Sequence, residues 1–120
     1  MIPKILQQEA EGDVTTITYW GWDTNWYEPM FEKFMEENPD IKIEATNVAY
    51  SDYFTKIQQA IASGSELPTM VQQSCTLIAN YKELGVFEDL TSDPYNVDPN
   101  IFFDFIKDRA MTEDGQLIGI

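Results

Sequence analysis

Apolar and polar residues follow two different periods along this chain, and the two periods alternate. Runs that are rich in β-branched and aromatic residues, or that alternate strictly, predict strands over residues 14–20, 41–48, 69–73 and 116–120. Between them, apolar residues recur every three or four positions and predict helices over residues 26–37, 53–62, 76–84 and 99–111. Strands that alternate with helices indicate an α/β fold with a mostly parallel sheet. Residues 1–12 show neither period and are expected to be a flexible lead-in.

The ends of the predicted helices carry start and stop signals. The expected N-caps are Thr24 or Asn25 for the first helix, Ser51 or Asp52 for the second, and Asp98, with Pro99 after it, for the last. Gly64 and Gly85 are typical of helix ends. The methionines and phenylalanines of the first helix form one stripe, which predicts a core face. The apolar cluster over residues 102–106 is expected to be core, or a face that is left bare.

Charge and composition narrow the function. The chain has 21 acidic and 7 basic residues, a formal net charge of −14 and no histidine. Such a chain repels phosphate backbones, which argues against nucleic-acid binding. Without histidine there is no histidine-based nucleophile system and no imidazole metal ligand. The single cysteine, Cys75, cannot form a disulfide within the chain or build a zinc cluster. We therefore expect a protein that uses neither a cofactor nor a metal.

Polar and aromatic residues gather where each predicted strand ends. Ligands of open α/β sheets bind beyond the carboxyl ends of the strands. The candidate ligand-binding residues are Trp22, Asp23 and Asn25 after the first strand, Tyr50 and Asp52 after the second, and Gln73, Ser74, Cys75 and Thr76 after the third. These side chains suit a sugar, whose ring face stacks on aromatic rings and whose hydroxyls need paired hydrogen-bond partners. A structural interpretation stays open for each of them: the polar residues as helix caps, the aromatic residues as packing, and the cysteine as a small buried residue.

Other function classes stay open on the residues alone. A receiver-like α/β signalling domain is also acidic, but here the third predicted strand ends in two glutamines and Lys107 falls within a helix. A glycan-active enzyme would need two carboxylates that face each other across a cleft, and no spacing singles out such a pair. No glycine-rich phosphate motif follows any predicted strand.

A series of short blocks resembles a known family. The blocks are Ile17–Trp22, Phe31–Phe34, Asn38–Ile43, Tyr50–Ile57, Ala62–Gly64, Leu67–Val71, Leu84–Leu90 and Gly115–Ile120. In this order and at these spacings, the chain resembles the amino-terminal part of the extracellular solute-binding proteins of sugar-uptake ABC transporters (family 1, maltose-binding-protein-like). The resemblance extends over about residues 13–120. Two positions depart from the family pattern, because Thr69 replaces an aspartate and Leu117 or Ile118 replaces an aromatic residue.

The resemblance implies a fold and a function. The fold would be a three-layer αβα lobe, with residues 13–120 as part of the N-terminal lobe of a two-lobe protein that closes on its ligand like a hinge. The function would be that of a carbohydrate receptor outside the cytoplasmic membrane, periplasmic or lipid-anchored, which hands its sugar to a membrane permease and performs no chemistry. By position, the family's sugar contacts would fall on the candidate residues named above.

Three further expectations concern the parts of such a protein that this chain contains. Residues 1–12 lack the long apolar centre of an export leader, so the leader is expected to be absent from this chain. With one lobe and half of a binding site, the chain alone is expected to bind sugar weakly or undetectably. An open sheet edge and exposed apolar surface would also favour self-association.

Overall fold

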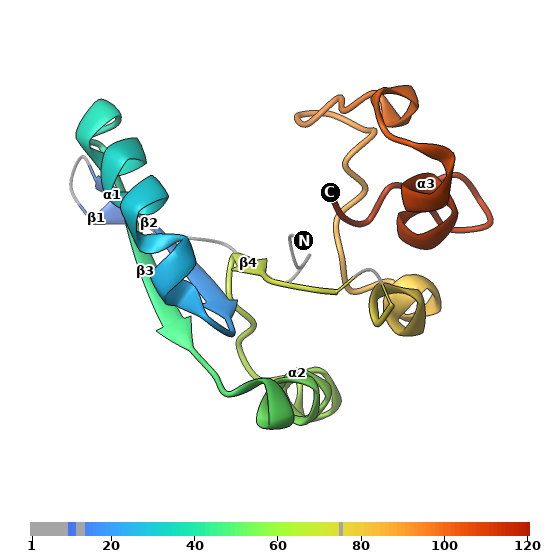
Figure 1. The fold of residues 1–120 in the computed structure, drawn as a ribbon, viewed down its shortest axis with the longest axis horizontal. Coiled ribbons are helices and arrows are strands. Elements are labelled where there is room, and N and C mark those ends of the chain that lie inside the picture. Colours follow the sequence, from blue (N-terminus) through green and yellow to red (C-terminus); the bar gives the residue numbers. More distant parts are fainter. Residues whose placement is uncertain (1–9, 12–13, 75) are drawn as a thin grey trace. The chain divides into compact units, whose positions relative to one another are not determined.

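The computed structural model describes residues 10–11, 14–74 and 76–120 of the chain. These residues fall into two compact units, one that ends at Gln72 and one that begins at Gln73 (Figure 1). The expected lead-in over residues 1–12 lies outside the described residues, apart from Ala10–Glu11, and so does Cys75.

The first unit is built on a sheet whose central strand is β2 (Val14–Gly21). Strand β3 (Ile41–Asn47) pairs with β2 in parallel along its whole length, from Thr15↔Ile41 to Gly21↔Asn47. Two short strands share the other side of β2: β4 (Met70–Val71) in parallel and β1 (Ala10–Glu11) antiparallel. The predicted mostly parallel sheet is therefore confirmed, although the third predicted strand, over residues 69–73, is shorter than expected.

Two helices lie on opposite faces of this sheet, because successive residues of a strand point to opposite sides. Tyr19 packs edge-on against Phe31 of α1 (Glu28–Glu37), with 5.1 Å between the ring centroids. Its neighbour Trp20 instead lies under the ammonium group of Lys56 in α2 (Tyr50–Ser63), 4.5 Å from the ring centroid. This arrangement gives the three layers that the resemblance implied.

The helices begin differently from what the capping residues predicted. A short 3-10 helix, η1 (Thr24–Trp26), precedes α1, and neither η1 nor α1 has a side-chain cap. Helix α2 begins at Tyr50, after Ala49, and also lacks a side-chain cap. Thr24, Asn25, Ser51 and Asp52 are therefore not N-caps, because all four lie inside the first turn of their helices. The predicted end of α2 is confirmed, since Gly64 adopts the left-handed conformation with φ 63°.

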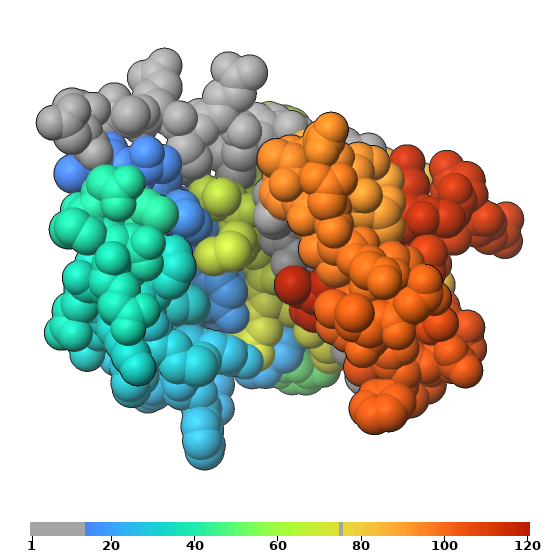
Figure 2. All heavy atoms as spheres, turned by 90° about the horizontal axis from the view of Figure 1, so that it is seen from above, coloured from blue at the N-terminus to red at the C-terminus, as the bar shows by residue number. Residues whose placement is uncertain are grey.

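The apolar stripe of α1 is only partly buried, so the prediction of a core face is wrong for much of it. Phe31 reaches Tyr19, and the sulfur of Met35 accepts a hydrogen bond from the backbone N–H of Ile43. Met30 and Phe34, on the same stripe, are 58% and 41% exposed. Within the described residues, α1 reaches the sheet at Tyr19 of β2 and at Ile43 of β3. Side chains of α1 consequently lie on the outer surface of the unit (Figure 2).

Strand β4 is fastened to β2 by a reciprocal pair of threonines. The backbone N–H of Thr18 donates to Thr69 Oγ1 at 3.1 Å, and the backbone N–H of Thr69 donates to Thr18 Oγ1 at 3.0 Å. The side-chain hydroxyls thus replace two ladder bonds just before β4 begins. Thr69 is one of the two positions that depart from the pattern behind the resemblance, and its side chain anchors this short strand.

The second unit consists of short helices and loops around a small core. Its helices are η2 (Ile78–Leu84), η3 (Pro99–Ile101) and α3 (Asp104–Ala110). Tyr81 and Leu117 are among its most deeply buried side chains. The predicted helix ends at Asp98 and Gly85 are confirmed, because the Asp98 carboxylate accepts from the N–H of Asn100 and Gly85 is left-handed with φ 65°.

Three predictions for the second unit need correction. The helix expected over residues 76–84 is a 3-10 helix, and the one expected over 99–111 breaks at Phe102–Phe103, where both residues are extended. The strand expected over residues 116–120 contributes only the bridge Met111↔Leu117, because the described residues give it no longer partner. In the 102–106 cluster, Phe103 is 74% exposed, so the bare-face alternative holds for that side chain.

Candidate functional site

The carboxyl ends of β2, β3 and β4 lie at one edge of the sheet. Parallel pairing brings the last residue of β2, Gly21, opposite the last residue of β3, Asn47. One step further, the N–H of Val48 donates to the carbonyl of Gly21 at 2.8 Å, and the N–H of Gln72 donates to the carbonyl of Trp20 at 2.8 Å. The loops that follow these strands therefore leave the sheet side by side.

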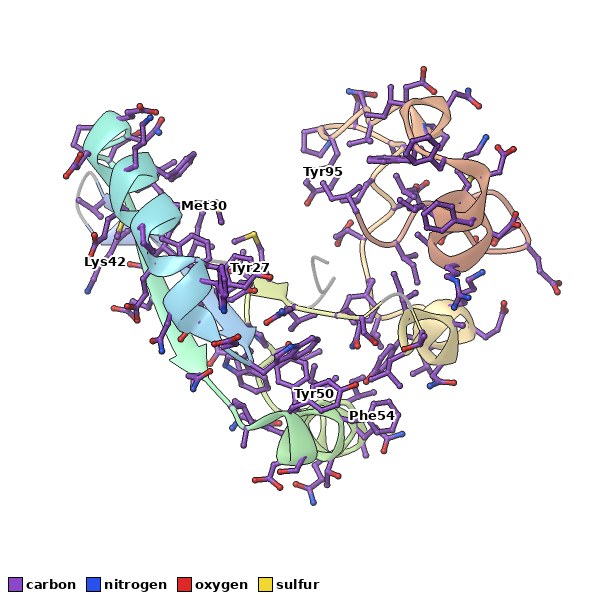
Figure 3. The ribbon with its side chains drawn as sticks, in the orientation of Figure 1. Tyr27, Met30, Lys42, Tyr50, Phe54 and Tyr95 are labelled. Carbon is purple, nitrogen blue, oxygen red and sulfur yellow. The ribbon has the colours of Figure 1, made fainter. Side chains whose placement is uncertain are left out.

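Three aromatic side chains meet at this edge, and we call them the aromatic cluster: Trp22, Tyr50 and Tyr53. The ring of Trp22 lies edge-on to both tyrosines, with centroids 5.1 Å from Tyr50 and 4.8 Å from Tyr53. Tyr53 is buried, and its hydroxyl donates to the carbonyl of Trp20 at 2.7 Å. Tyr50 is 58% exposed and stands on α2 toward the end of β2 (Figure 3). The cluster thus has a fixed base and an open aromatic face.

Polar candidates flank the aromatic cluster and are exposed. Asp23 adopts the left-handed conformation, with φ 61° and ψ 41°, which turns the chain directly after Trp22. Asn25 follows in η1, and Asp52 lies in the first turn of α2, where its carboxylate accepts from the Ser51 hydroxyl at 3.2 Å. Carboxylate and amide groups next to an open aromatic face can bind neighbouring hydroxyls of a sugar ring.

The loop after β2 is held by residues that the sequence did not single out. The N–H of Thr24 donates to Asn47 Oδ1 at 3.4 Å, and Thr24 itself is buried. The N–H of Trp22 donates to Gln72 Oε1 at 3.0 Å. The two acceptors, Asn47 and Gln72, lie 23 and 50 positions away from their donors along the chain, so no local sequence motif pointed to them. The one available signal was their position, since each stands at the polar end of a predicted strand.

The third predicted segment belongs to the second unit and is occupied with local bonds there. Gln73 Oε1 accepts from the N–H of Ser74 at 3.3 Å. The Ser74 hydroxyl accepts from the N–H of Leu77 at 3.3 Å and lies 3.0 Å from Thr76 Oγ1. These bonds shape the turn that leads into η2. The structure brings the first two segments together, at the end of β2 and the start of α2. The third segment belongs to the second unit.

Tyr19, in the sheet beneath α1, has a shifted pKa. Burial, with a smaller contribution from nearby Tyr27, raises the pKa of Tyr19 to about 12, so this phenol stays protonated at physiological pH. Across the described ranges 10–11, 14–74 and 76–120, no three His, Cys, Asp or Glu side chains come together as metal ligands. In the same ranges, no helix has both the length and the apolar character that a bilayer span requires.

The family is decided by a sequence comparison that covers most of the chain. The family model described as "Bacterial extracellular solute-binding protein" matches residues 20–112. The chain belongs to this family. The prediction drawn from the short sequence blocks is therefore confirmed, and the family is one of extracellular binding proteins rather than of enzymes.

Solved structures of solute-binding proteins share the fold. A crystal structure of an extracellular solute-binding protein of family 1 matches 88% of this chain with a TM-score of 0.78 at 20% identity. The GacH receptor of Streptomyces glaucescens, solved without ligand and in complex with acarbose, matches 85% with a TM-score of 0.72 at 20% identity. An ABC substrate-binding protein from Listeria monocytogenes, in complex with cycloalternan, matches 84% with a TM-score of 0.69 at 31% identity.

The chain is much shorter than these solute-binding proteins. It spans 27% of the length of each of the three structures. The shared part is the mixed α/β architecture with a parallel sheet, which confirms the predicted fold class. The activities of the longer proteins are their own.

Proposed function

We propose that this chain supplies one side of a carbohydrate-binding site, as part of the substrate receptor of an ABC transporter. The observation that carries the proposal is the aromatic cluster, which sets an exposed Tyr50 and a half-buried Trp22 at the carboxyl edge of a parallel sheet. The Listeria protein bound to cycloalternan, at 31% identity, supports the same ligand class.

The arrangement suits a sugar better than an ion or a flat apolar molecule. A sugar ring presents C–H groups on its face, which pack on an aromatic ring, and hydroxyls along its rim. Tyr50 offers the aromatic face, and the exposed groups of Asp23, Asn25 and Asp52 offer acceptors and a donor for the rim. A second lobe would close over the opposite face of the sugar and remove water from it.

The remaining parts of the proposal follow from the family. The receptor would work outside the cytoplasmic membrane, held in the periplasm or by a lipid anchor, and would deliver its sugar to a membrane permease. It would bind and release the sugar unchanged. A chain that contributes only one side of the site should bind weakly, because half of the desolvated contact surface is missing.

A heteronuclear NMR titration of the chain with maltotriose, mannotriose and glucose tests the proposal. We expect shifts confined to residues 22–25, 50–52 and 73–76, and the loss of those at 22–25 and 50–52 in Tyr50→Ala. Phe103→Ala is a matched control, because it removes an exposed ring from the second unit. Shifts that persist unchanged in Tyr50→Ala, or that spread evenly over both units, would contradict the proposal.

A further inference from the structure

The side chain of Gln72 connects two parts of the candidate site that are far apart in sequence. Its Oε1 accepts from the backbone N–H of Trp22 at 3.0 Å, and its Nε2 donates to the hydroxyl of Tyr27 at 3.2 Å. Its own backbone N–H donates to the carbonyl of Trp20 at 2.8 Å. One residue therefore extends the β2–β4 pairing with its backbone and clamps the loop after β2 with its side chain.

The absence of a side chain at Gly21 makes this clamp possible. A Cβ atom at Gly21 would lie 2.7 Å from Gln72 Oε1 and 2.7 Å from Tyr19 Cε1. Real Cβ atoms do not approach other heavy atoms so closely. The amide of Gln72 consequently occupies the space that any other residue at position 21 would fill, and the two positions are matched to each other.

The hydrogen bonds also determine which way the amide of Gln72 points. A backbone N–H can only donate, so the atom of Gln72 that faces Trp22 must be the oxygen. The NH₂ group then faces Tyr27, and the phenolic oxygen of Tyr27 is the acceptor. The hydroxyl proton of Tyr27 is directed away from Gln72 and is available to another acceptor.

We infer that Gln72 is a positioning residue that holds Trp22 in the orientation needed for ligand binding. It acts through the backbone of Trp22 rather than by touching the sugar. This inference rests on the proposed function, because it assigns Gln72 to the same site. Without the amide oxygen, the Trp22 N–H loses its acceptor at the point where the chain turns into the left-handed Asp23. The indole would then leave its edge-on contacts with Tyr50 and Tyr53 for part of the time.

The test separates the orientation of Trp22 from sugar binding. The chain is labelled with 5-fluorotryptophan, and its three indole resonances are assigned with Trp20→Phe and Trp26→Phe. The variant Gln72→Met keeps the length of the side chain and replaces the amide by a thioether, which is a much weaker acceptor, whereas Gln72→Glu keeps a strong acceptor for the Trp22 N–H. Gln59→Met on the exposed surface of α2 is the matched control.

We expect the Trp22 resonance to move toward its position in the unfolded chain in Gln72→Met and to stay in Gln72→Glu and Gln59→Met. Affinity for maltotriose should fall about threefold to tenfold in Gln72→Met, as for the loss of one hydrogen bond. Amide hydrogen exchange of the Trp22 N–H in the unmodified chain adds a measurement that needs no variant, and we expect it to be protected.

The outcomes decide separately whether Gln72 holds Trp22 in place and whether the chain binds a sugar. A Trp22 resonance that does not move in Gln72→Met, or a Trp22 N–H that exchanges as fast as a free amide, overturns the positioning role whether or not sugar binds. A resonance that moves while the affinity stays the same overturns the link to binding. A chain that binds none of the sugars overturns the proposed function, while the resonance still decides whether Gln72 holds Trp22.

Discussion

Side-chain hydrogen bonds span longer stretches of the chain in the first unit than in the second, where the N–H of Leu117 and the carboxylate of Asp89 form a long-range example. In the first unit, side chains join residues about fifty positions apart, as in Thr18 with Thr69 and Trp22 with Gln72. In the second unit, many side-chain bonds join residues two to four positions apart, as in Asp98 with Asn100 and Thr112 with Gln116. Long-range bonds close large loops and depend on the whole sheet, whereas local bonds shape one turn each. The first unit is therefore the better frame for a binding site, because its loops are placed by the sheet.

The largest effect should come from Gly21→Ala, which disturbs the packing between Gly21, Tyr19 and Gln72 in the first unit. The added methyl group would force the amide of Gln72 and the ring of Tyr19 to shift, and overpacking of this kind costs about 1–3 kcal/mol. Urea unfolding followed by NMR should show the first unit destabilised and the second unchanged. Gly85→Asn in the second unit is the matched control, because Asn tolerates a left-handed φ and open space surrounds this site. An equal loss in both variants would contradict the comparison.

A smaller loss is expected for Thr69→Val, which removes one half of the threonine pair. The N–H of Thr18 loses its acceptor, and an unpaired, partly buried N–H costs about 1–2 kcal/mol. The unfolding free energy of the first unit should fall by that amount. Thr55→Val, at an exposed position of α2, should change it far less. If the two variants behave alike, the threonine pair does not anchor β4.

The second unit should instead be sensitive to acid through Asp89. Burial of this carboxylate acts to raise its pKa, but hydrogen bonds from Thr91, Ser92 and the N–H of Leu117 outweigh it and hold the pKa below its ordinary value. A lowered folded pKa gives stability that is present above the ordinary value near 4 and is lost as the pH falls through the lowered one. Asp89→Asn should cost roughly 1 kcal/mol at pH 7 and flatten this dependence. Unfolding of the second unit between pH 6 and 2.5 tests it, and an unchanged acid profile would refute it.

The smallest effect is expected for Asp23→Gly, and it should have opposite signs for stability and binding. Glycine adopts φ 61° without strain, so the first unit should gain about 1 kcal/mol or less. The same change removes a carboxylate from the candidate site and should weaken the binding of maltotriose. Asp23→Asn keeps the tolerance for this conformation and is the control. Equal affinity in Asp23→Gly and the unmodified chain would exclude Asp23 from the site.

Much of the first unit could be predicted because its signals are local. The β-branched and aromatic run of β2 and the alternation of β3 appear in the sequence, and Gly64 marks the end of α2. The start of α2 could not be predicted from Ser51 and Asp52, because the helix begins with backbone bonds to Ala49 and needs no side-chain cap. A residue that can cap a helix is visible in the sequence, but the residue at which the helix begins depends on the backbone hydrogen bonds of the folded chain.

The candidate site also has residues that the local sequence indicates and residues that depend on the folded chain. Trp22 and Tyr50 could be named from the sequence, because aromatic residues after strands are visible in it. Gln72 could not, because its role depends on an acceptor placed beside Trp22 by strand pairing across fifty residues. The exposed part of the α1 stripe, including Met30, was expected in a core because periodicity reports an apolar face and not what covers it. Self-association through such surface stays a prediction.

The neighbouring glutamines Gln72 and Gln73 have a consequence for the variation that this protein can tolerate. The two residues are of the same type, yet the side chain of the first accepts from the N–H of Trp22 and that of the second from the N–H of Ser74. A deletion of one of them gives the same sequence whichever codon is lost, and the glutamine that remains cannot serve both partners. In a mutational scan, single substitutions here should therefore affect different readouts, whereas the one-residue deletion should affect both.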